Sequence, residues 1–156
     1  MCYIKETLLQ LSCNIDDANP QNYEYISERL FDAGALDVWL TPIIMKKSRS
    51  ADTLSVLLRP EQREACLSII FAETTTLGVR EESITRWSLE REFKTVATKY
   101  GPISCKIAKK GGEIMNISAE YEDCKKAAAK YGAPLKEVQR EALAAARHDI
   151  DLQNKT

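Results

Sequence analysis

The sequence has little of the chemistry that most metal and nucleophile sites need. Among 156 residues it holds one histidine, His148, and five cysteines. These are widely spaced, odd in number and free of any C-x-x-C pair, which disfavours a disulfide framework and a zinc site closed by this chain alone. A Ser-His-Asp or Cys-His arrangement is equally disfavoured. We expect His148 at the surface and every cysteine as a small buried or half-buried residue: Cys2, Cys13, Cys66, Cys105 and Cys124.

An excess of charge of one sign is also missing. Lysine and arginine number 22 and aspartate and glutamate 23, for a formal net charge of −1. General nucleic-acid binding neutralises many phosphates at once, so we do not expect it. A single polyanionic small molecule needs only a local basic cluster and stays possible.

Long apolar runs are absent, and none approaches the ~20 residues of a membrane helix. The N-terminus has no basic start, apolar stretch or cleavage site of a signal peptide. We expect a cytoplasmic protein without a membrane partner. No GxxxxGK[ST] run and no GxGxxG run occurs either, so a nucleotide site would have to be assembled from scattered residues.

What is present is a regular succession of elements over residues 1–91. Helical stripes after Pro20 and Pro60 separate four segments with the alternation or composition of strands, at residues 7–16, 36–45, 54–58 and 79–91. The order βαββαβ predicts an α+β, ferredoxin-like domain with two helices on one face of an antiparallel sheet. Its second strand lies at the sheet edge, which suits Pro42 because proline cannot donate to a ladder.

Individual residues predict where these elements end. Asn19 and Pro20 are typical of a helix N-cap and first turn, and Gly34 of a C-terminal glycine cap. Residues 46–52 are expected to be a polar turn before the third strand. Ser118 is expected to cap a later helix.

Residues 92–149 predict an appended subdomain packed on this core. Residues 99–102, KYGP, are a turn signal between two short strands, and a further short strand follows Gly111 and Gly112. Two helices come next, and the last should end near Arg147. Residues 150–156 are polar and are expected to form a frayed tail.

Three polar clusters lie at junctions between elements, where binding groups usually sit. Asp16 and Asp17 end the first strand and have the oxygen ligands that Mg²⁺ or Mn²⁺ takes beside phosphates. The alternative is that they only end a strand and start a helix.

The second cluster holds Lys46, Lys47 and Arg49 within four residues, which suits a triphosphate. Its alternative is a solvated hairpin tip. The third cluster has three hydroxyls, a glycine and a cation, a composition that fits an anion pocket or simply turn and strand residues: Thr74, Thr75, Thr76, Gly78 and Arg80.

Several strings in one order resemble the LarC family, whose C-terminal half binds CTP. NIDDANP is similar to the family's N-I-D-D-M-N-P start, followed by GALDV, TPI and MKKSR. FAETTTLGVR, YGPISCKIAK and NISAEYEDCKKAA resemble its R-E-T-T-T-L-G-V-R segment, its Y-G-x-V hairpin and its P-E-Y-E-D-C-x-x-A helix. These strings run from about residue 7 to 145.

The resemblance implies the CTP-binding domain of a nickel-inserting cyclometallase of the lyase class. Such an enzyme uses CTP, cleaved to CMP and pyrophosphate, to insert nickel into pyridinium-3,5-bisthiocarboxylic acid mononucleotide, giving the nickel-pincer cofactor. It also implies partners: the pincer precursor, the N-terminal LarC domain, and further copies in a homo-oligomer, a trimer or hexamer. We expect this chain alone not to be fully active.

The same resemblance implies roles for the three clusters. Asp16 and Asp17 would hold Mg²⁺ or Mn²⁺ on the triphosphate, and Lys46 and Arg80 would act as catalytic residues that stabilise charge on departing pyrophosphate. The phosphate-binding residues would be Lys46, Lys47, Arg49, Thr74, Thr75, Thr76 and Arg80.

The main alternative is a non-catalytic ferredoxin-like module that senses a ligand or holds subunits together through the edge strand with Trp39 and Ile43. RNA binding is disfavoured by the charge and by the lack of stacking aromatics in the first and third strands.

Overall fold

The computed structural model describes residues 3–153, so Cys2 and the last part of the predicted tail, residues 154–156, lie outside it. It divides into two compact units, residues 5–86 and residues 87–153 together with residues 3 and 4. Each unit has its own hydrophobic core. The boundary predicted after residue 91 falls inside the strand β5 (Glu90–Thr98).

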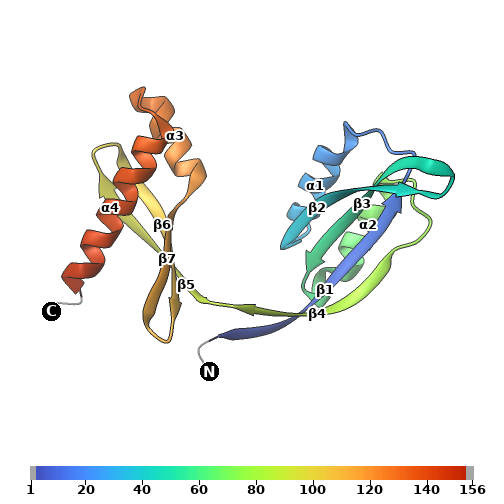
Figure 1. Cartoon of the computed structure of the whole chain (residues 1–156), viewed down its shortest axis with the longest axis horizontal. Coiled ribbons are helices and arrows are strands. Elements are labelled where there is room, and N and C mark those ends of the chain that lie inside the picture. Colours follow the sequence, from blue (N-terminus) through green and yellow to red (C-terminus); the bar gives the residue numbers. More distant parts are fainter. Residues whose placement is uncertain (1–2, 154–156) are drawn as a thin grey trace. The chain divides into compact units, whose positions relative to one another are not determined.

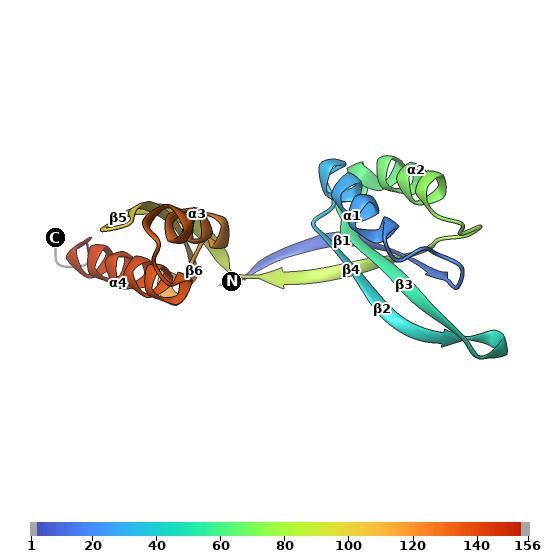
Figure 2. The same ribbon diagram turned by 90° about the horizontal axis from the view of Figure 1, so that it is seen from above.

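The unit of residues 5–86 is a four-stranded antiparallel sheet with two helices on one face (Figures 1 and 2). The strand order β2-β3-β1-β4 confirms the predicted ferredoxin-like α+β topology, with β2 at an edge. Its elements are β1 (Ile4–Ile15), α1 (Asn22–Asp32), β2 (Asp37–Met45), η1 (Lys46–Ser48), β3 (Arg49–Leu58), η2 (Pro60–Gln62), α2 (Arg63–Glu73) and β4 (Arg80–Ser88).

The core of this unit follows from the alternation of its central strands. Leu11 lies opposite Val56 and Cys13 opposite Leu54, and all four are at most 1% exposed. Burying one such aliphatic side chain contributes about 1.5–3 kcal/mol. The predicted helical stripes are confirmed, because the buried helix residues are Tyr23, Ile26 and Leu30 on α1 and Cys66, Ile69 and Ile70 on α2.

The hairpin of β2 and β3 projects beyond the end of β1 (Figure 2). Pairing of β1 with β3 ends at Ile15 and Asp52, whereas β2 and β3 stay paired up to Met45 and Arg49. The prediction of a turn over residues 46–52 was therefore wrong: only Lys46–Ser48 turn, and β3 begins at Arg49. Polar residues extend the strand here because β2 still supplies a hydrogen-bonding partner.

The ends of α1 differ in how well they were predicted. The N-cap residue is Gln21, and the Asn19 side chain accepts the Gln21 N–H at 3.1 Å, closing a turn before the helix instead of capping it. The glycine cap is confirmed. Gly34 has φ +95° and its N–H reaches the Phe31 carbonyl at 2.9 Å.

The second unit packs two helices on a three-stranded sheet of order β5-β6-β7. Its elements are β5 (Glu90–Thr98), β6 (Gly101–Lys110), β7 (Glu113–Ala119), α3 (Tyr121–Tyr131) and α4 (Leu135–Gln153). Ser118 is no helix cap: it pairs with Lys106 inside the sheet, and Glu120 is the N-cap residue. Helix α4 continues past the predicted end because Ile150, four residues after Ala146, is buried on the same side.

The thiols and the histidine lie where they were expected. Cys13, Cys66, Cys105 and Cys124 are buried and unpaired, and His148 is exposed. None of the helices between residues 3 and 153 has the length and apolar character needed to cross a membrane.

Candidate functional site

Polar side chains from three segments meet at the end of β1. Asn14 is the last but one residue of this strand, and Asp16 and Asp17 follow it. Asn14 and Asp16 are two residues apart and so tend to point to the same side of the sheet. Each of the three has a partner that arrives from β3, from β4 or from the loop between α2 and β4.

Arg49, the first residue of β3, reaches back to Asp16. Its Nη1 donates to Oδ2 of Asp16 at 3.0 Å, and the side chains of Arg49 and Asp16 are 54% and 22% exposed. Exposed ion pairs of this kind contribute only about 0–1 kcal/mol to stability. The pair can therefore open for a ligand at little cost.

Arg80, the first residue of β4, binds the other end of the cluster. Its Nη2 donates to Oδ1 of Asn14 at 2.8 Å, and the same oxygen accepts the Thr53 hydroxyl at 2.9 Å. Burial raises the pKa of the Cys13 thiol, which Thr76 and Arg80 partly offset by lowering it. Arg80 and Thr76 thus both lie near the last residues of β1.

The hydroxyls of the three threonines make different hydrogen bonds. The Thr75 hydroxyl donates to Oδ1 of Asp17. The Thr74 hydroxyl donates to the Ile70 carbonyl at 2.7 Å, and that of Thr76 to the Gly78 carbonyl at 2.9 Å. Thr75 therefore faces the cluster, while Thr74 and Thr76 shape the loop that carries it.

Lys46 and Lys47 are not joined to this group. Both are exposed in the turn at the hairpin tip and make no ion pair with a residue between 3 and 153. Lys47 and Ser48 have φ +60° and +56°, in the left-handed region. Of the predicted site residues, the structure brings together Asp16, Asp17, Arg49, Thr75 and Arg80.

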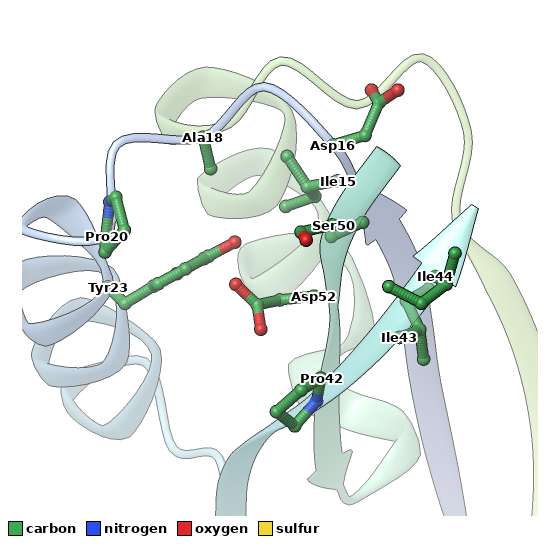
Figure 3. Close-up of a pocket in the computed structure, with 11 residues that line it drawn as sticks. Ile15, Asp16, Ala18, Pro20, Tyr23, Pro42, Ile43, Ile44, Ser50 and Asp52 are labelled. Carbon is green, nitrogen blue, oxygen red and sulfur yellow. The ribbon is translucent and has the colours of Figure 1, made fainter. Parts of the chain in front are cut away.

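A pocket of about 500 Å³ opens beside this cluster, on the helix side of the sheet (Figure 3). We call it the Tyr23–Asp52 pocket. Its walls come from the connection between β1 and α1, the first turn of α1, and the projecting hairpin. The residues that line it are Ile15, Asp16, Ala18, Pro20, Tyr23, Pro42, Ile43, Ile44, Ser50, Ala51 and Asp52. Asp16 is the one lining residue that also belongs to the polar cluster, and its carboxylate points away from Tyr23 and Asp52 (Figure 3).

Tyr23 carries an unusual polar group in this pocket. The residue is 7% exposed, and its hydroxyl faces the Asp52 carboxylate (Figure 3). Burial, and after it the neighbouring Asp52 carboxylate, raises the pKa of Tyr23 to about 12.

Sequence reasoning missed Tyr23 and Asp52 as site residues. Tyr23 was read only as part of the apolar stripe of α1. Asp52 was assigned to a turn, which hid that it shares a strand face with Leu54 and Val56. The available signal was a carboxylate that falls on the same side of the strand as two core residues.

A divalent cation would find few ligands here without a bound phosphate. Among residues 3–153 no group of three or more histidine, cysteine, aspartate or glutamate side chains could hold a metal ion. Asp16 and Asp17 supply two carboxylates, so a cation would take further oxygens from a ligand and water. Mg²⁺ commonly binds in this way beside phosphates.

Comparisons with known proteins agree on one family. Residues 2–139 match the family model described as "Nickel insertion protein". A pyridinium-3,5-bisthiocarboxylic acid mononucleotide nickel insertion protein of Thermotoga sp. (strain RQ2) is 47% identical over 130 residues, 83% of this chain and 32% of that protein. A protein of the same name from Clostridium kluyveri is 47% identical over 115 residues, 74% of this chain and 29% of that protein.

A solved structure extends the likeness to the fold. It is described as LarC2, the C-terminal domain of a cyclometallase involved in the synthesis of the NPN cofactor of lactate racemase, in its apo form. The TM-score is 0.86 at 35% identity, covering 92% of this chain and 99% of that one. The chain spans about a third of the length of the curated relatives it matches. It belongs to the nickel insertion protein family and corresponds there to the C-terminal domain of LarC.

Proposed function

We propose that this chain binds CTP together with Mg²⁺ or Mn²⁺ and is the CTP-binding part of a nickel insertase. The observation that carries the proposal is the meeting of Arg49, Arg80 and Thr75 with Asp16, Asp17 and Asn14 at the end of β1. Two guanidinium groups and two carboxylates in one cluster suit an anion that arrives with a divalent cation.

The pairings in the free chain are ones that a triphosphate would replace. Arg80 holds a neutral amide oxygen of Asn14, and Arg49 holds an exposed carboxylate. Hydrogen bonds to a charged acceptor are roughly twice as strong as those to a neutral one. Arg80 therefore gains by exchanging Asn14 for a phosphate oxygen, and Arg49 in moving frees Asp16.

The two carboxylates fit the cation that accompanies the nucleotide. Asp16 and Asp17 would contribute oxygen ligands, with the triphosphate and water completing the set. The bound cation would neutralise phosphate charge. Asp17 is held by the Thr75 hydroxyl, which keeps the loop between α2 and β4 beside the phosphates.

Cleavage of CTP to CMP and pyrophosphate leaves negative charge on the departing pyrophosphate. Fixed cations stabilise such charge. Arg80, which donates to Asn14 in this cluster, would take this role. Lys46, with Lys47 beside it on the hairpin tip, would bring its ammonium group to the phosphates from the solvent side.

The complete reaction belongs to a longer protein. We propose that nickel is inserted into pyridinium-3,5-bisthiocarboxylic acid mononucleotide with the N-terminal LarC domain as partner, and that copies form a cytoplasmic homo-oligomer, a trimer or hexamer. The names of the relatives support the substrate and the inserted metal. The lyase chemistry and the CTP requirement are what the resemblance to the LarC family implies, and the site described above supports only an anion that binds with a divalent cation.

Thermal unfolding of the 156-residue chain tests the proposal. At a CTP concentration 100 times Kd, binding adds about 2.7 kcal/mol to stability. We expect a rise of several degrees in Tm with CTP and Mg²⁺, and a smaller one with ATP. If millimolar CTP leaves the Tm of a folded sample unchanged, that result instead supports the alternative of a non-catalytic module.

A further inference from the structure

Helix α4, the long C-terminal helix in Figure 1, has one buried side and one exposed, positively charged side. Val138, Ala142 and Ala146 are 0% exposed and belong to the core of the second unit. Three exposed cations, spaced four and seven residues apart, share a different side of the helix. We call them the α4 basic stripe: Lys136, Arg140 and Arg147.

The carboxylates of α4 are arranged differently from its cations. Glu137 accepts from the Tyr100 hydroxyl at 3.4 Å, and Asp149 pairs with Lys94 at 3.6 Å. Both partners belong to β5 or to the turn that follows it. The helix thus directs these acids toward its own unit and leaves the basic stripe on the outside.

The α4 basic stripe has almost no partners of its own. Lys136 and Arg147 make no hydrogen bond or ion pair with another residue between 3 and 153. Arg140 reaches Glu137 at 3.5 Å, and its side chain is 76% exposed. An exposed ion pair of this kind contributes about 0–1 kcal/mol. All three cations are therefore available to negative groups from outside the unit.

A depression of about 410 Å³ follows the stripe along the helix. Every residue that lines it comes from α4: Lys136, Gln139, Arg140, Leu143, Ala144 and Arg147. Leu143 is half-buried and lies between Arg140 and Arg147 along the helix. The stripe therefore surrounds an apolar contact point instead of a purely solvated surface.

The surface continues from α4 onto β7. Arg147 also lines a second pocket, of about 360 Å³, whose walls include Met115 and Asn116 of β7. This strand lies at an edge of its sheet, and Met115 is an extra residue where the pairing with β6 shifts. Met115 is 51% exposed. Arginine and methionine are both enriched at protein–protein interfaces, so this composition favours a protein partner.

The charge of the stripe decides between possible occupants. In a symmetric pair a second copy presents the same patch to itself, which would bring the arginines of the two stripes close together. Nucleic acid is bound by neutralising many phosphates, whereas this surface has three cations in a chain of formal net charge −1. An acidic protein surface with an apolar group at its centre complements both the cations and Leu143.

The chain spans about a third of the length of the curated relatives it matches, so most of the longer protein lies outside it. We propose that the α4 basic stripe binds an acidic surface of the N-terminal LarC domain of that longer protein. The inference rests on the proposed function, because there the N-terminal domain is the partner of this chain. It assigns the second unit a role in holding the two parts together.

Lysine acetylation in a longer protein tests this contact. The 156-residue chain is joined to the part of the Thermotoga protein that it does not match, in place of that protein's own matching region. We expect Lys136 to react at least about fivefold more slowly in the joined protein than in the isolated chain, as when four fifths of the molecules are docked. Lys125, whose side chain is 60% exposed on α3, is the reference and should react equally in both.

Charge reversal tests whether the stripe carries the contact. Arg140→Glu combined with Arg147→Glu should return the acetylation rate of Lys136 to that of the isolated chain. Raising NaCl to about 0.5 M, where charges are screened beyond about 4 Å, should do so in part. The matched control is Lys126→Glu combined with Lys130→Glu, which makes the same change of charge at exposed positions on α3 and should leave Lys136 protected.

Melting curves establish that each variant is folded. Substitutions at exposed positions usually change stability by less than about 0.5 kcal/mol. Arg140→Gln combined with Arg147→Gln is a milder variant that should also lose most of the protection. The rise in Tm with CTP and Mg²⁺ should persist in both variants, because the stripe belongs to the other compact unit.

Four results overturn the inference in distinguishable ways. Equal acetylation of Lys136 in the isolated chain and the joined protein means that the stripe is free, while the CTP response judges the proposed function separately. Protection that survives both arginine variants means that the cations do not carry the contact. If sedimentation of the isolated chain shows an oligomer that the arginine variants dissociate, the occupant is a second copy. If a single-stranded RNA oligonucleotide binds the isolated chain and the arginine variants abolish this binding, the occupant is nucleic acid.

Discussion

Nη1 of Arg49 donates to Oδ2 of Asp16 at 3.0 Å, and this bond ties the first residue of β3 to the residue that follows β1. Asp16 belongs both to the polar cluster and to the lining of the Tyr23–Asp52 pocket. The exposure of the Arg49–Asp16 pair, 54% and 22%, makes it a weak contributor to stability. Its members are therefore more important to what binds than to the folding of the chain.

Asp16→Asn separates these two contributions. We expect CTP with Mg²⁺ to bind at least tenfold more weakly, because one carboxylate for the cation is lost. The free energy of unfolding in urea should change by less than about 1 kcal/mol. Glu92→Gln, which breaks the exposed pair of Glu92 with Lys109 in the other unit, is the control and should leave binding unchanged. Unchanged CTP affinity in Asp16→Asn would remove Asp16 from the site.

Binding of the divalent cation should depend on the nucleotide. Because two carboxylates are too few to hold Mn²⁺ tightly alone, MnCl₂ without nucleotide should leave Tm unchanged. CTP with MnCl₂ should raise Tm, and excess EDTA should reverse most of the rise. A Tm increase with MnCl₂ alone equal to that with CTP would point to a complete metal site in the free chain.

The core between sheet and helices predicts a contrast between two leucines. Leu11 is 0% exposed, whereas Leu77 is 99% exposed in the loop before β4. Leu11→Ala should lower the free energy of unfolding by about 2–5 kcal/mol, through lost burial and a cavity. Leu77→Ala should change it by less than about 0.5 kcal/mol. Urea titration followed by circular dichroism measures both, and similar values would contradict the packing described.

Two glycines offer a parallel contrast. A Cβ at Gly34, where φ is +95°, would lie 2.9 Å from Cγ of Gln62, whereas a Cβ at Gly78 would meet nothing within 4 Å. Gly34→Ala should therefore destabilise by at least about 1 kcal/mol, since alanine is strained at positive φ. Gly78→Ala should be close to neutral in thermal unfolding. Equal melting temperatures of the two variants would count against the cap at the end of α1.

The buried thiols predict slow alkylation in the folded chain. Burial raises the pKa of Cys13, Cys66, Cys105 and Cys124. A raised pKa leaves less thiolate at a given pH, and the thiolate is the reacting form. Iodoacetamide at pH 8 should modify these four cysteines slowly in the folded chain and rapidly in guanidinium, as mass spectrometry of peptides would report. Fast labelling of Cys66 in the folded chain would contradict its burial.

Much of the fold was predictable from local patterns. The alternation that ends in Leu11, Cys13 and Ile15 identified β1, and Pro42 identified the edge strand, because both signals are set by neighbours in sequence. Ser118 was misassigned since its sheet partner, Lys106, lies in another strand whose register no local pattern specifies. Helix and strand ends depend on such distant partners.

The site also contains residues that the sequence predicted and residues that it did not. Asp16, Asp17, Arg49, Thr75 and Arg80 stood out because charged and hydroxyl groups gathered in short stretches of sequence, and the structure brings these stretches together at β1. Tyr23 and Asp52 lie in different elements and meet only through the packing of α1 on the sheet. Their polar groups lie side by side only in the folded chain, which no sequence pattern records.

The turn at the tip of the projecting hairpin has a consequence for how this surface could be altered. Lys47 and Ser48 adopt a backbone conformation that costs residues with a side chain about 1–2 kcal/mol each and glycine almost nothing. Replacing both by glycine would thus raise the free energy of unfolding of the unbound chain and remove one ammonium group. At this turn, the substitution that raises stability also removes positive charge.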